Sequence, residues 1–283
     1  VLAWPLWLAG VHLAPGLAIA ALLLAATGQA LATLRFARLL RASAAGDTAH
    51  ARVIAIGWAV GTLTLAGLAL ALWQDDLDGA RRWLHTALWG FVALVYVTVV
   101  HRMIPFFTSS TLPLVQLWRP MWVLHALVAT VALKVLGPWL TLAGLSASAW
   151  SAFEGFALLV AGFVVLWLAF MWGLAQSLKI RLLAMLHLGF VWLGLGLVID
   201  GTGLVWGWIS GAPLNPLAAL HATTMGFLGS LMVAMVTRVS CGHGGRSLVA
   251  DRLAWSAFLL LQAATVLRIA AALAPPAWMG PLT

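Results

Sequence analysis

"RLLAMLHLGFVWLGLGLVIDGTGLVW", residues 181–206, is a long apolar segment that holds few polar side chains. After Arg181, the first strongly polar residue is His187, and Asp200 lies near the far end. About 20 apolar residues are enough for an α-helix to cross the hydrocarbon core of a bilayer. The segment therefore predicts a transmembrane helix.

The same kind of segment recurs along the whole chain. Such runs lie at residues 14–34, 52–73, 83–104, 118–142, 151–175, 181–206, 216–238 and 252–273. They predict an all-α fold, a polytopic transmembrane helical bundle of about eight full spans, with residues 1–283 as a single transmembrane domain. Residues 1–11 are too short to span and predict the end of a further helix, without a signal peptide. With the turn-like residues 274–283 at the other end, we expect a fragment of a longer protein.

The composition supports a membrane protein and excludes other classes. Of 283 residues, 64% are hydrophobic and only 8% are charged, which leaves too few polar residues to cover a soluble domain. The net charge of +8 comes from basic residues in short loops between apolar runs, a pattern that indicates membrane topology rather than nucleic-acid binding. Cys241 is the only cysteine, so an internal disulfide and a multi-cysteine zinc or iron–sulfur site are excluded.

The basic residues favour one side of the predicted membrane. Cytoplasmic loops of membrane proteins carry an excess of Lys and Arg. One side holds 11 of the 15 basic residues, namely Arg35, Arg38, Arg41, Arg52, Arg102, Arg119, Lys179, Arg181, Arg238, Arg246 and Arg252. The other side holds Arg81, Arg82, Lys134 and Arg268. The bias predicts that the first side, called the inner side below, is cytoplasmic.

The histidines inside the predicted spans fall on two levels. An ionisable side chain in a span is costly and usually faces the bundle interior. His85 and His221 both lie roughly 4–8 Å below the outer boundary, at about 1.5 Å of rise per residue. His187 and His125 lie roughly 10 Å above the inner boundary, with His101 nearer to that edge.

Two level histidines on different helices can hold a heme, because a neutral imidazole nitrogen is a good axial ligand for iron. His85 and His221 therefore predict a heme site. Two other interpretations stay open for such histidines, an interhelical hydrogen bond and a proton relay. The remaining two, His12 and His50, are expected at the surface.

The stretch "VVHRMIPFFTSSTLP", residues 99–113, predicts the inner end of a span. Pro105 is expected to end the helix. Arg102, at the inner boundary, either extends to lipid headgroups or binds a carboxylate such as a heme propionate. The same two interpretations apply to Arg238 and Arg246.

Glycines surround the remaining candidate groups. In "CGHGG", residues 241–245, they let backbone amides approach an anion. Cys241 and His243 are together candidate ligands for Cu(I), since thiolate suits that soft ion, but two ligands are only a weak signal of a metal site. Gly226 and Gly229 lie near His221 on their helix and are expected to serve packing, although such a face also leaves room for a flat macrocycle.

Three blocks of the chain resemble a known family. "HRMIPFFT" (101–108), "LHLGFVWLGLGL" (186–197) and "ALHATTMGFLGSLMVAMVTRVSCGHGGRSL" (219–248) are similar to the signature segments of the NnrS family. The resemblance covers most of the chain from residue 81 to 275. It implies a multi-pass protein of the bacterial inner membrane that contains heme and copper, belongs to a larger bundle of about twelve helices, and helps cells tolerate nitric oxide.

The resemblance also implies functional residues. His85, His187 and His221 correspond to heme or metal ligands, the match at His85 being looser than the others. The further cofactor-binding residues that it implies are Arg102, Arg238, His243 and Arg246, and the other motif positions are Pro105, Thr108 and Gly245. The chain departs from the pattern at His101, where a glycine is expected, and at Cys241, where an apolar residue is expected. Further histidines expected in an N-terminal region are absent, so a cofactor that needs them would be incomplete here.

Three classes of function follow. The leading one is a heme or heme–copper protein whose partners are the lipid bilayer and nitric oxide or a derived small molecule. The second is an enzyme like the catalytic subunit of heme–copper oxidases or nitric-oxide reductases, against which stands the lack of an adjacent His–His pair. The third is a transporter or structural bundle, against which Glu154 and Asp200 lie near outer ends rather than at mid-membrane. No catalytic residue is assigned.

Overall fold

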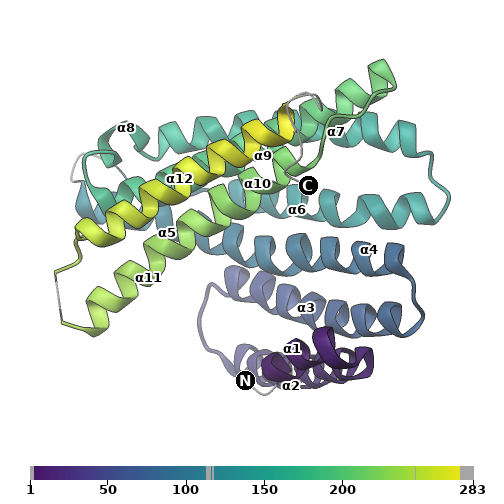
Figure 1. Cartoon of the computed structure of the whole chain (residues 1–283). Helices are drawn as coiled ribbons and strands as arrows, with labels where there is room; N and C mark the ends of the chain where they lie inside the picture. The colour runs from purple at the N-terminus through teal and green to yellow at the C-terminus, as the bar shows by residue number, and fades with distance from the viewer. Residues whose placement is uncertain (1–2, 113–115, 117, 246, 275–283) are drawn as a thin grey trace. The chain divides into compact units, whose positions relative to one another are not determined.

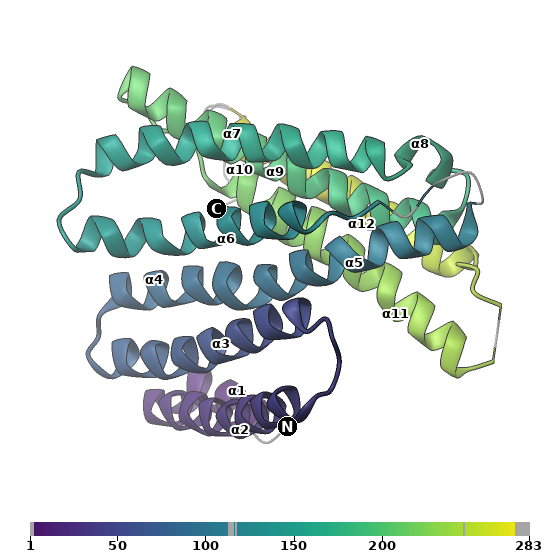
Figure 2. The same cartoon turned by 180° about the vertical axis from the view of Figure 1, so that it is seen from behind.

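The computed structural model describes residues 3–112, 116, 118–245 and 247–274, and these contain α- and π-helices but no strand (Figures 1 and 2). Eight helical runs in this part of the chain are long and apolar enough to cross a membrane, which confirms the predicted all-α polytopic fold and its eight spans. The elements are α1 (Ala3–Leu13), α2 (Pro15–Ala42), α3 (Ala49–Trp73), α4 (Leu77–Ala87), η1 (Leu88–Ala93), α5 (Leu94–Thr111), α6 (Met121–Leu142), α7 (Ala147–Met171), α8 (Leu174–Ser177), α9 (Arg181–Ser210), α10 (Leu217–His221), η2 (Ala222–Gly229), α11 (Ser230–His243) and α12 (Arg252–Leu273).

Two of the spans each contain a π-helical segment. Elements α4, η1 and α5 form one unbroken run, Leu77–Thr111, and α10, η2 and α11 form another, Leu217–His243. In a π-helix the backbone hydrogen bonds join residues five apart, so one extra residue is accommodated in the turn. Such segments are rare and are frequently found at functional sites.

Helix α5 passes through Pro105 and ends at Thr111, so the predicted end of the helix at Pro105 is wrong. A proline lacks a backbone N–H, but a membrane helix tolerates it where hydroxyl groups nearby bond to the backbone. Here the carbonyl that lacks a backbone donor is that of His101, and the nearby Thr108, which is fully buried, donates from Oγ1 to a different carbonyl, that of Ile104, over 2.8 Å. The span is therefore longer at its inner end than its apolar run suggests.

Residues 3–99 and 127–144 belong to one compact unit. In it, α1 packs on α2, α2 on α3, and α3 on both α4 and η1 (Figure 1). Gly61 allows the last of these approaches, because a Cβ at Gly61 would lie 2.7 Å from the Phe91 ring. His50 is buried in this unit, which corrects its expected surface position. The reason is that α3 begins at Ala49 and carries His50 in its first turn, where a loop was expected.

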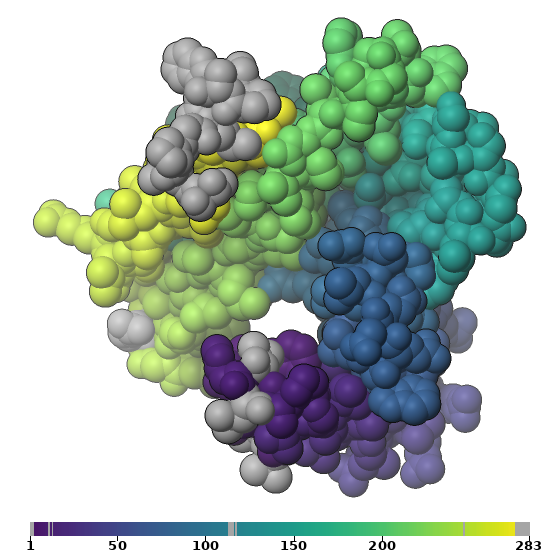
Figure 3. All heavy atoms as spheres, turned by 45° about the vertical axis from the view of Figure 1, so that its right-hand side comes forward, coloured from purple at the N-terminus to yellow at the C-terminus, as the bar shows by residue number. Residues whose placement is uncertain are grey.

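Residues 100–126 and 145–274 belong to a second compact unit. Its most extensive helix–helix contact is between α7 and α9. These two helices are antiparallel, and the short α8 connects them (Figure 2). Glycines line this contact: a Cβ at Gly162 would lie 2.9 Å from the Gly194 carbonyl oxygen, and one at Gly201 would lie 2.7 Å from that of Gly155. Helix α12 packs on α10, η2 and α11 and presents its other face at the surface (yellow in Figure 3).

Candidate functional site

His85 lies in the last turn of α4, within the first unit, and its ring is engaged by the backbone. Its Nε2 lies 2.9 Å from the carbonyl oxygen of Lys134 on α6. A carbonyl only accepts, so the imidazole donates and Nε2 carries the proton. Lys134 itself is buried, with its Nζ 5.6 Å from the centre of the Trp89 ring, which is also buried. Iron ligation through Nε2 would therefore require that the bond to Lys134 be given up.

His221 lies at the end of α10, in the second unit, and its ring is half-buried. Ala218 and Ala222, on either side of it along the helix, are fully buried. No hydrogen bond joins the His221 ring to another residue in the described part of the chain. Its ring nitrogens are thus available as ligands without the loss of a protein contact.

Both of these histidines lie within three residues of the start of a π-helical segment. Segment η1 begins three residues after His85, and η2 begins immediately after His221. Nothing in the sequence predicts these segments, because apolar periodicity does not distinguish an α-helix from one with a π-helical turn. The coincidence marks the outer halves of these two spans as functional candidates.

Side chains of other helices cover the two glycines that follow His221 in its span, Gly226 and Gly229. A Cβ at Gly226 would lie 2.6 Å from Cγ of Trp192, and one at Gly229 would lie 3.3 Å from Leu261. Trp192 is held there because its Nε1 donates to Oε1 of Gln262 over 2.7 Å. Packing, rather than room for a macrocycle, is the role that this geometry supports for both glycines.

His187 is fully buried in α9, and both of its ring nitrogens face backbone carbonyls. Nδ1 lies 3.1 Å from the carbonyl oxygen of Leu183, and Nε2 lies 3.2 Å from that of Trp172. A neutral imidazole has one N–H, so it donates to only one of these two oxygens, and both accept only from an imidazolium. Neither nitrogen presents a free lone pair toward a metal.

His101 and Trp172 form, with His187, a buried inner group that the sequence did not predict. The fully buried His101 has its Nε2 3.1 Å from the Pro120 carbonyl oxygen, and its ring meets that of Trp172 edge-on at 6.5 Å. Trp172 Nε1 donates in turn to the carbonyl of Trp118 over 3.0 Å. The sequence places His101 on the inner level near His187, but no spacing signal links either histidine to Trp172.

The predicted inner-edge cluster is assembled in part. The Arg238 guanidinium lies over the Phe107 ring, 3.7 Å from its centre, so the first and third motif blocks meet here. Arg238, Phe107, Gly242 and His243 help to line a cavity of about 440 Å³. Sequence reasoning misses Phe107 as a site residue, because an aromatic residue in an apolar run carries no signal of its partner.

No hydrogen bond, ion pair or ring contact joins the other described inner-edge residues to the Arg238–Phe107 pair, although His243 lines the same cavity. Arg102 is exposed, and Arg246 lies outside the described residues. Gly245 has a φ of 61°, a left-handed conformation that favours glycine. Cys241 is buried, whereas His243 is exposed and has its Nδ1 3.0 Å from the Val239 carbonyl oxygen.

The described side chains could supply a single axial ligand to a heme iron, but they do not form a cluster of several metal ligands. Among the described residues there is no group of three or more His, Cys, Asp or Glu side chains that could hold a metal ion. One imidazole is enough to hold a heme iron on one side, and His221 meets that requirement. Cys241 and His243 alone do not make a copper centre.

Fold and site together define a multi-pass α-helical membrane protein with polar groups concentrated on a few helices. Comparison with protein-family models gives a match to "NnrS protein" over residues 1–283. The chain therefore belongs to the NnrS family, a family of membrane proteins of the nitric-oxide response, and the match extends the resemblance to the first 80 residues. No curated protein and no solved structure matches the chain.

Proposed function

We propose that this protein is a heme-binding protein of the bacterial inner membrane that acts in the response to nitric oxide, with His221 as an axial ligand. Family membership supports the nitric-oxide response. The observation that carries the ligand assignment is the His221 ring, which has no hydrogen bond to a described residue and is followed directly by a π-helical segment. When bound, a heme iron supplies a coordination position for nitric oxide or a derived species.

The other predicted residues enter the proposal in distinct roles. His85 and His187 are proposed ligands that would first have to release the carbonyls of Lys134 and Trp172. Arg238 is proposed to hold an anionic group at the inner edge, because its guanidinium is fixed over Phe107. Arg238 lies 17 residues after His221 in the same run, about 25 Å along the helix, so this group is not a propionate of a heme bound by His221.

The same inner-edge role is proposed for three further predicted residues, His243, Arg102 and Arg246. Copper, which the resemblance implies, would need ligands beyond Cys241 and His243.

The test is the heme content of the protein purified with an adequate heme supply. We expect a Soret band that shifts on addition of nitric oxide, and a heme-to-protein ratio that falls about tenfold or more in His221→Ala, since even the loss of a group that supports a metal ligand weakens metal binding by about 10–100-fold. His125→Ala is the matched control, because His125 is exposed on α6 and likewise has no hydrogen bond to a described residue. Equal heme content in the two variants would remove His221 as a ligand, and a wild-type protein without a Soret band would reject the heme proposal.

A further inference from the structure

A cavity within the first unit lies between α2 and α3 and is called the α2–α3 cavity below. Its volume is about 500 Å³, within the range of about 300–1,000 Å³ that is typical of small-molecule sites. Arg35 is the only charged residue among the described residues that line it, and none of them is a proposed heme-binding residue. The cavity is therefore a candidate site of its own.

Helical spacing places an arginine between two exposed leucines on the α2 side of the cavity. Leu31, Arg35 and Leu39 follow one another at intervals of four and all line the cavity, so they lie on one face of the helix. The exposed fraction is 55% for Leu31 and 70% for Leu39, and Arg35 is also exposed. An occupant must therefore offer apolar surface to the leucines and a negative charge to the arginine.

Aromatic rings form much of the remaining wall. Trp58 of α3 and Phe36 of α2 both line the cavity, with ring centres 6.1 Å apart. Gln29, also on α2, donates from Nε2 to the Trp58 carbonyl over 3.2 Å. Contacts between the two helices thus hold an apolar wall in place.

Arg35 lies toward the inner end of its span. It is seven residues before the end of α2 at Ala42, or about 10 Å along the helix, and a long basic side chain at this depth reaches the headgroup level. The cavity extends from Arg35 by a further seven residues, to Gly28, in the direction of the membrane interior. The charged group thus lies toward the headgroups, and the deeper part of the cavity lies at the level of the acyl chains.

The charge of Arg35 is not matched by the described protein. No hydrogen bond or ion pair joins its guanidinium to another residue in the described part of the chain. Three more exposed arginines lie at the same end of α2 and α3, and the loop between these helices holds one acidic residue; they are Arg38, Arg41, Arg52 and Asp47. The inner end of this helix pair is therefore positively charged.

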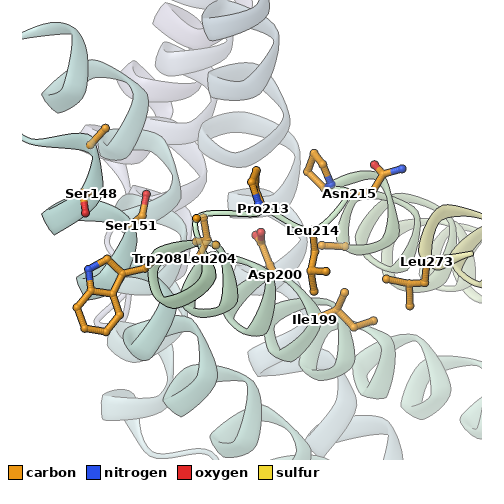
Figure 4. Close-up of a pocket in the computed structure, with 16 residues that line it drawn as sticks. Ser148, Ser151, Ile199, Asp200, Leu204, Trp208, Pro213, Leu214, Asn215 and Leu273 are labelled. Atoms are coloured by element: carbon orange, nitrogen blue, oxygen red, sulfur yellow. The ribbon is translucent and has the colours of Figure 1, made fainter. Parts of the chain in front are cut away.

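The cavity at the predicted outer ends of α7, α9 and α10 differs in this respect. Figure 4 shows Asp200 pointing into it, and Asp200 is the only charged residue among its described lining residues. Asp200 takes part in an interaction within the protein, however. Its carboxylate is thus already engaged, whereas Arg35 has no such partner.

We propose that the α2–α3 cavity binds an anionic phospholipid of the leaflet on the inner side. The Arg35 guanidinium donates to oxygens of the lipid phosphate. An acyl chain lies along Leu31 and the Phe36–Trp58 pair toward Gly28. Basic pockets between transmembrane helices on the cytoplasmic side are suited to anionic headgroups. This function is independent of heme binding.

The test is native mass spectrometry of the full chain in detergent with three lipids that carry the same two oleoyl chains. These are the anionic phosphatidylglycerol, the zwitterionic phosphatidylcholine and dioleoylglycerol, which has no phosphate. We expect the first molecule of phosphatidylglycerol to bind at least about tenfold more tightly than dioleoylglycerol, as hydrogen bonds to a charged group imply, with phosphatidylcholine between them. Equal binding of phosphatidylglycerol and either of the other two lipids would overturn the proposal.

Two further measurements exclude other occupants. Glycerol 3-phosphate has the phosphate but no chains, so it should not displace the lipid at equal concentration, because apolar walls favour only a ligand with apolar surface. Displacement would mean that the site takes a free phosphate. Dimers of the chain that disappear in Arg35→Gln would mean that a second copy covers the cavity, and this result would also overturn the proposal.

Variants separate the roles of charge and space. Arg35→Gln should weaken phosphatidylglycerol binding about tenfold or more and leave dioleoylglycerol binding unchanged. Arg41→Gln is the matched control, because Arg41 is exposed on the same helix but does not line the cavity; as an exposed charge it should change binding by a few fold at most. Ala32→Phe keeps Arg35 but fills the cavity, and it should weaken both lipids.

An equal loss in the Arg35 and Arg41 variants would refute the site, because the lipid would then respond to surface charge in general. Thermal melting of each variant identifies misfolding. If Ala32→Phe misfolds, the comparison of Arg35→Gln with Arg41→Gln still decides the question, since both arginines are exposed.

Discussion

The contact between α7 and α9 makes a sharp prediction for Gly201→Ala. A Cβ at Gly201 would lie 2.7 Å from the carbonyl oxygen of Gly155 and 2.9 Å from the backbone nitrogen of Leu159. Ordinary van der Waals contact begins at 3.4 Å, so the two helices must separate locally by about 0.7 Å. Both obstructing atoms belong to the backbone, so no side-chain rotation relieves the contact.

The expected change in stability of Gly201→Ala is the sum of two opposing contributions, overpacking and helix propensity. Overpacking costs about 1–3 kcal/mol, and two backbone obstacles place Gly201→Ala at the upper end of that range. Replacement of a helical glycine by alanine contributes about 1 kcal/mol in the opposite direction. Gly28→Ala isolates this second term, because Gly28 lies within α2 and a Cβ added there would have nothing within 4 Å. We therefore expect Gly28→Ala to be stabilised and Gly201→Ala to be less stable than Gly28→Ala by about 2–3 kcal/mol.

The assay is thermal melting of the three proteins in one detergent, followed by circular dichroism. At about 2–4 °C per kcal/mol for a chain of this size, Gly201→Ala should melt roughly 5–10 °C below Gly28→Ala. Gly162→Ala, which meets the Gly194 carbonyl oxygen at 2.9 Å, should behave like Gly201→Ala. If Gly201→Ala melts as high as Gly28→Ala, the helices are not in backbone contact at this glycine and the reasoning fails.

Two further substitutions test local features. Trp192→Phe keeps a ring against Gly226 but removes the donor to Gln262. We therefore expect the free energy of unfolding, measured by chemical denaturation, to fall by about 1–3 kcal/mol. An unchanged midpoint would show that this hydrogen bond contributes nothing. Pro105→Ala should leave the helical content unchanged in far-ultraviolet circular dichroism, because α5 already continues through Pro105; a measurable gain of helix would mean that the proline ends it.

The number and type of spans could be predicted because they depend on the length of apolar runs, a one-dimensional property. Helix ends were less predictable, since polar and charged residues just outside the hydrocarbon core continue a helix without an energetic penalty. Helix α4 thus begins at Leu77 rather than at residue 83, and α3 begins early enough to bury His50. The π-helical segments have no counterpart in apolar periodicity at all.

The site was less predictable for a different reason. Depth along a helix follows from residue counting, and it made candidates of His85, His187 and His221. Which atom each imidazole meets depends on the rotation of its helix and on loops, such as the one that brings the Pro120 carbonyl to His101. Contacts between distant residues, such as Arg238 over Phe107, require the folded arrangement and cannot be obtained from either segment alone.

The cost of polar groups in hydrocarbon bears directly on His221. An unsatisfied polar group there costs several kcal/mol. Polar side chains in the spans avoid this cost by bonding to the backbone of their own helix, since the fully buried Thr98 and Thr265 both donate to the carbonyl four residues earlier. His85 and His187 follow the same rule, with ring nitrogens at backbone carbonyls. The half-buried His221 bonds to no described group, and the glycines that follow it in the span are covered by Trp192 and Leu261. His125, which is exposed on α6, also bonds to no described residue, so His221 is distinguished by its half-buried position directly before a π-helical segment.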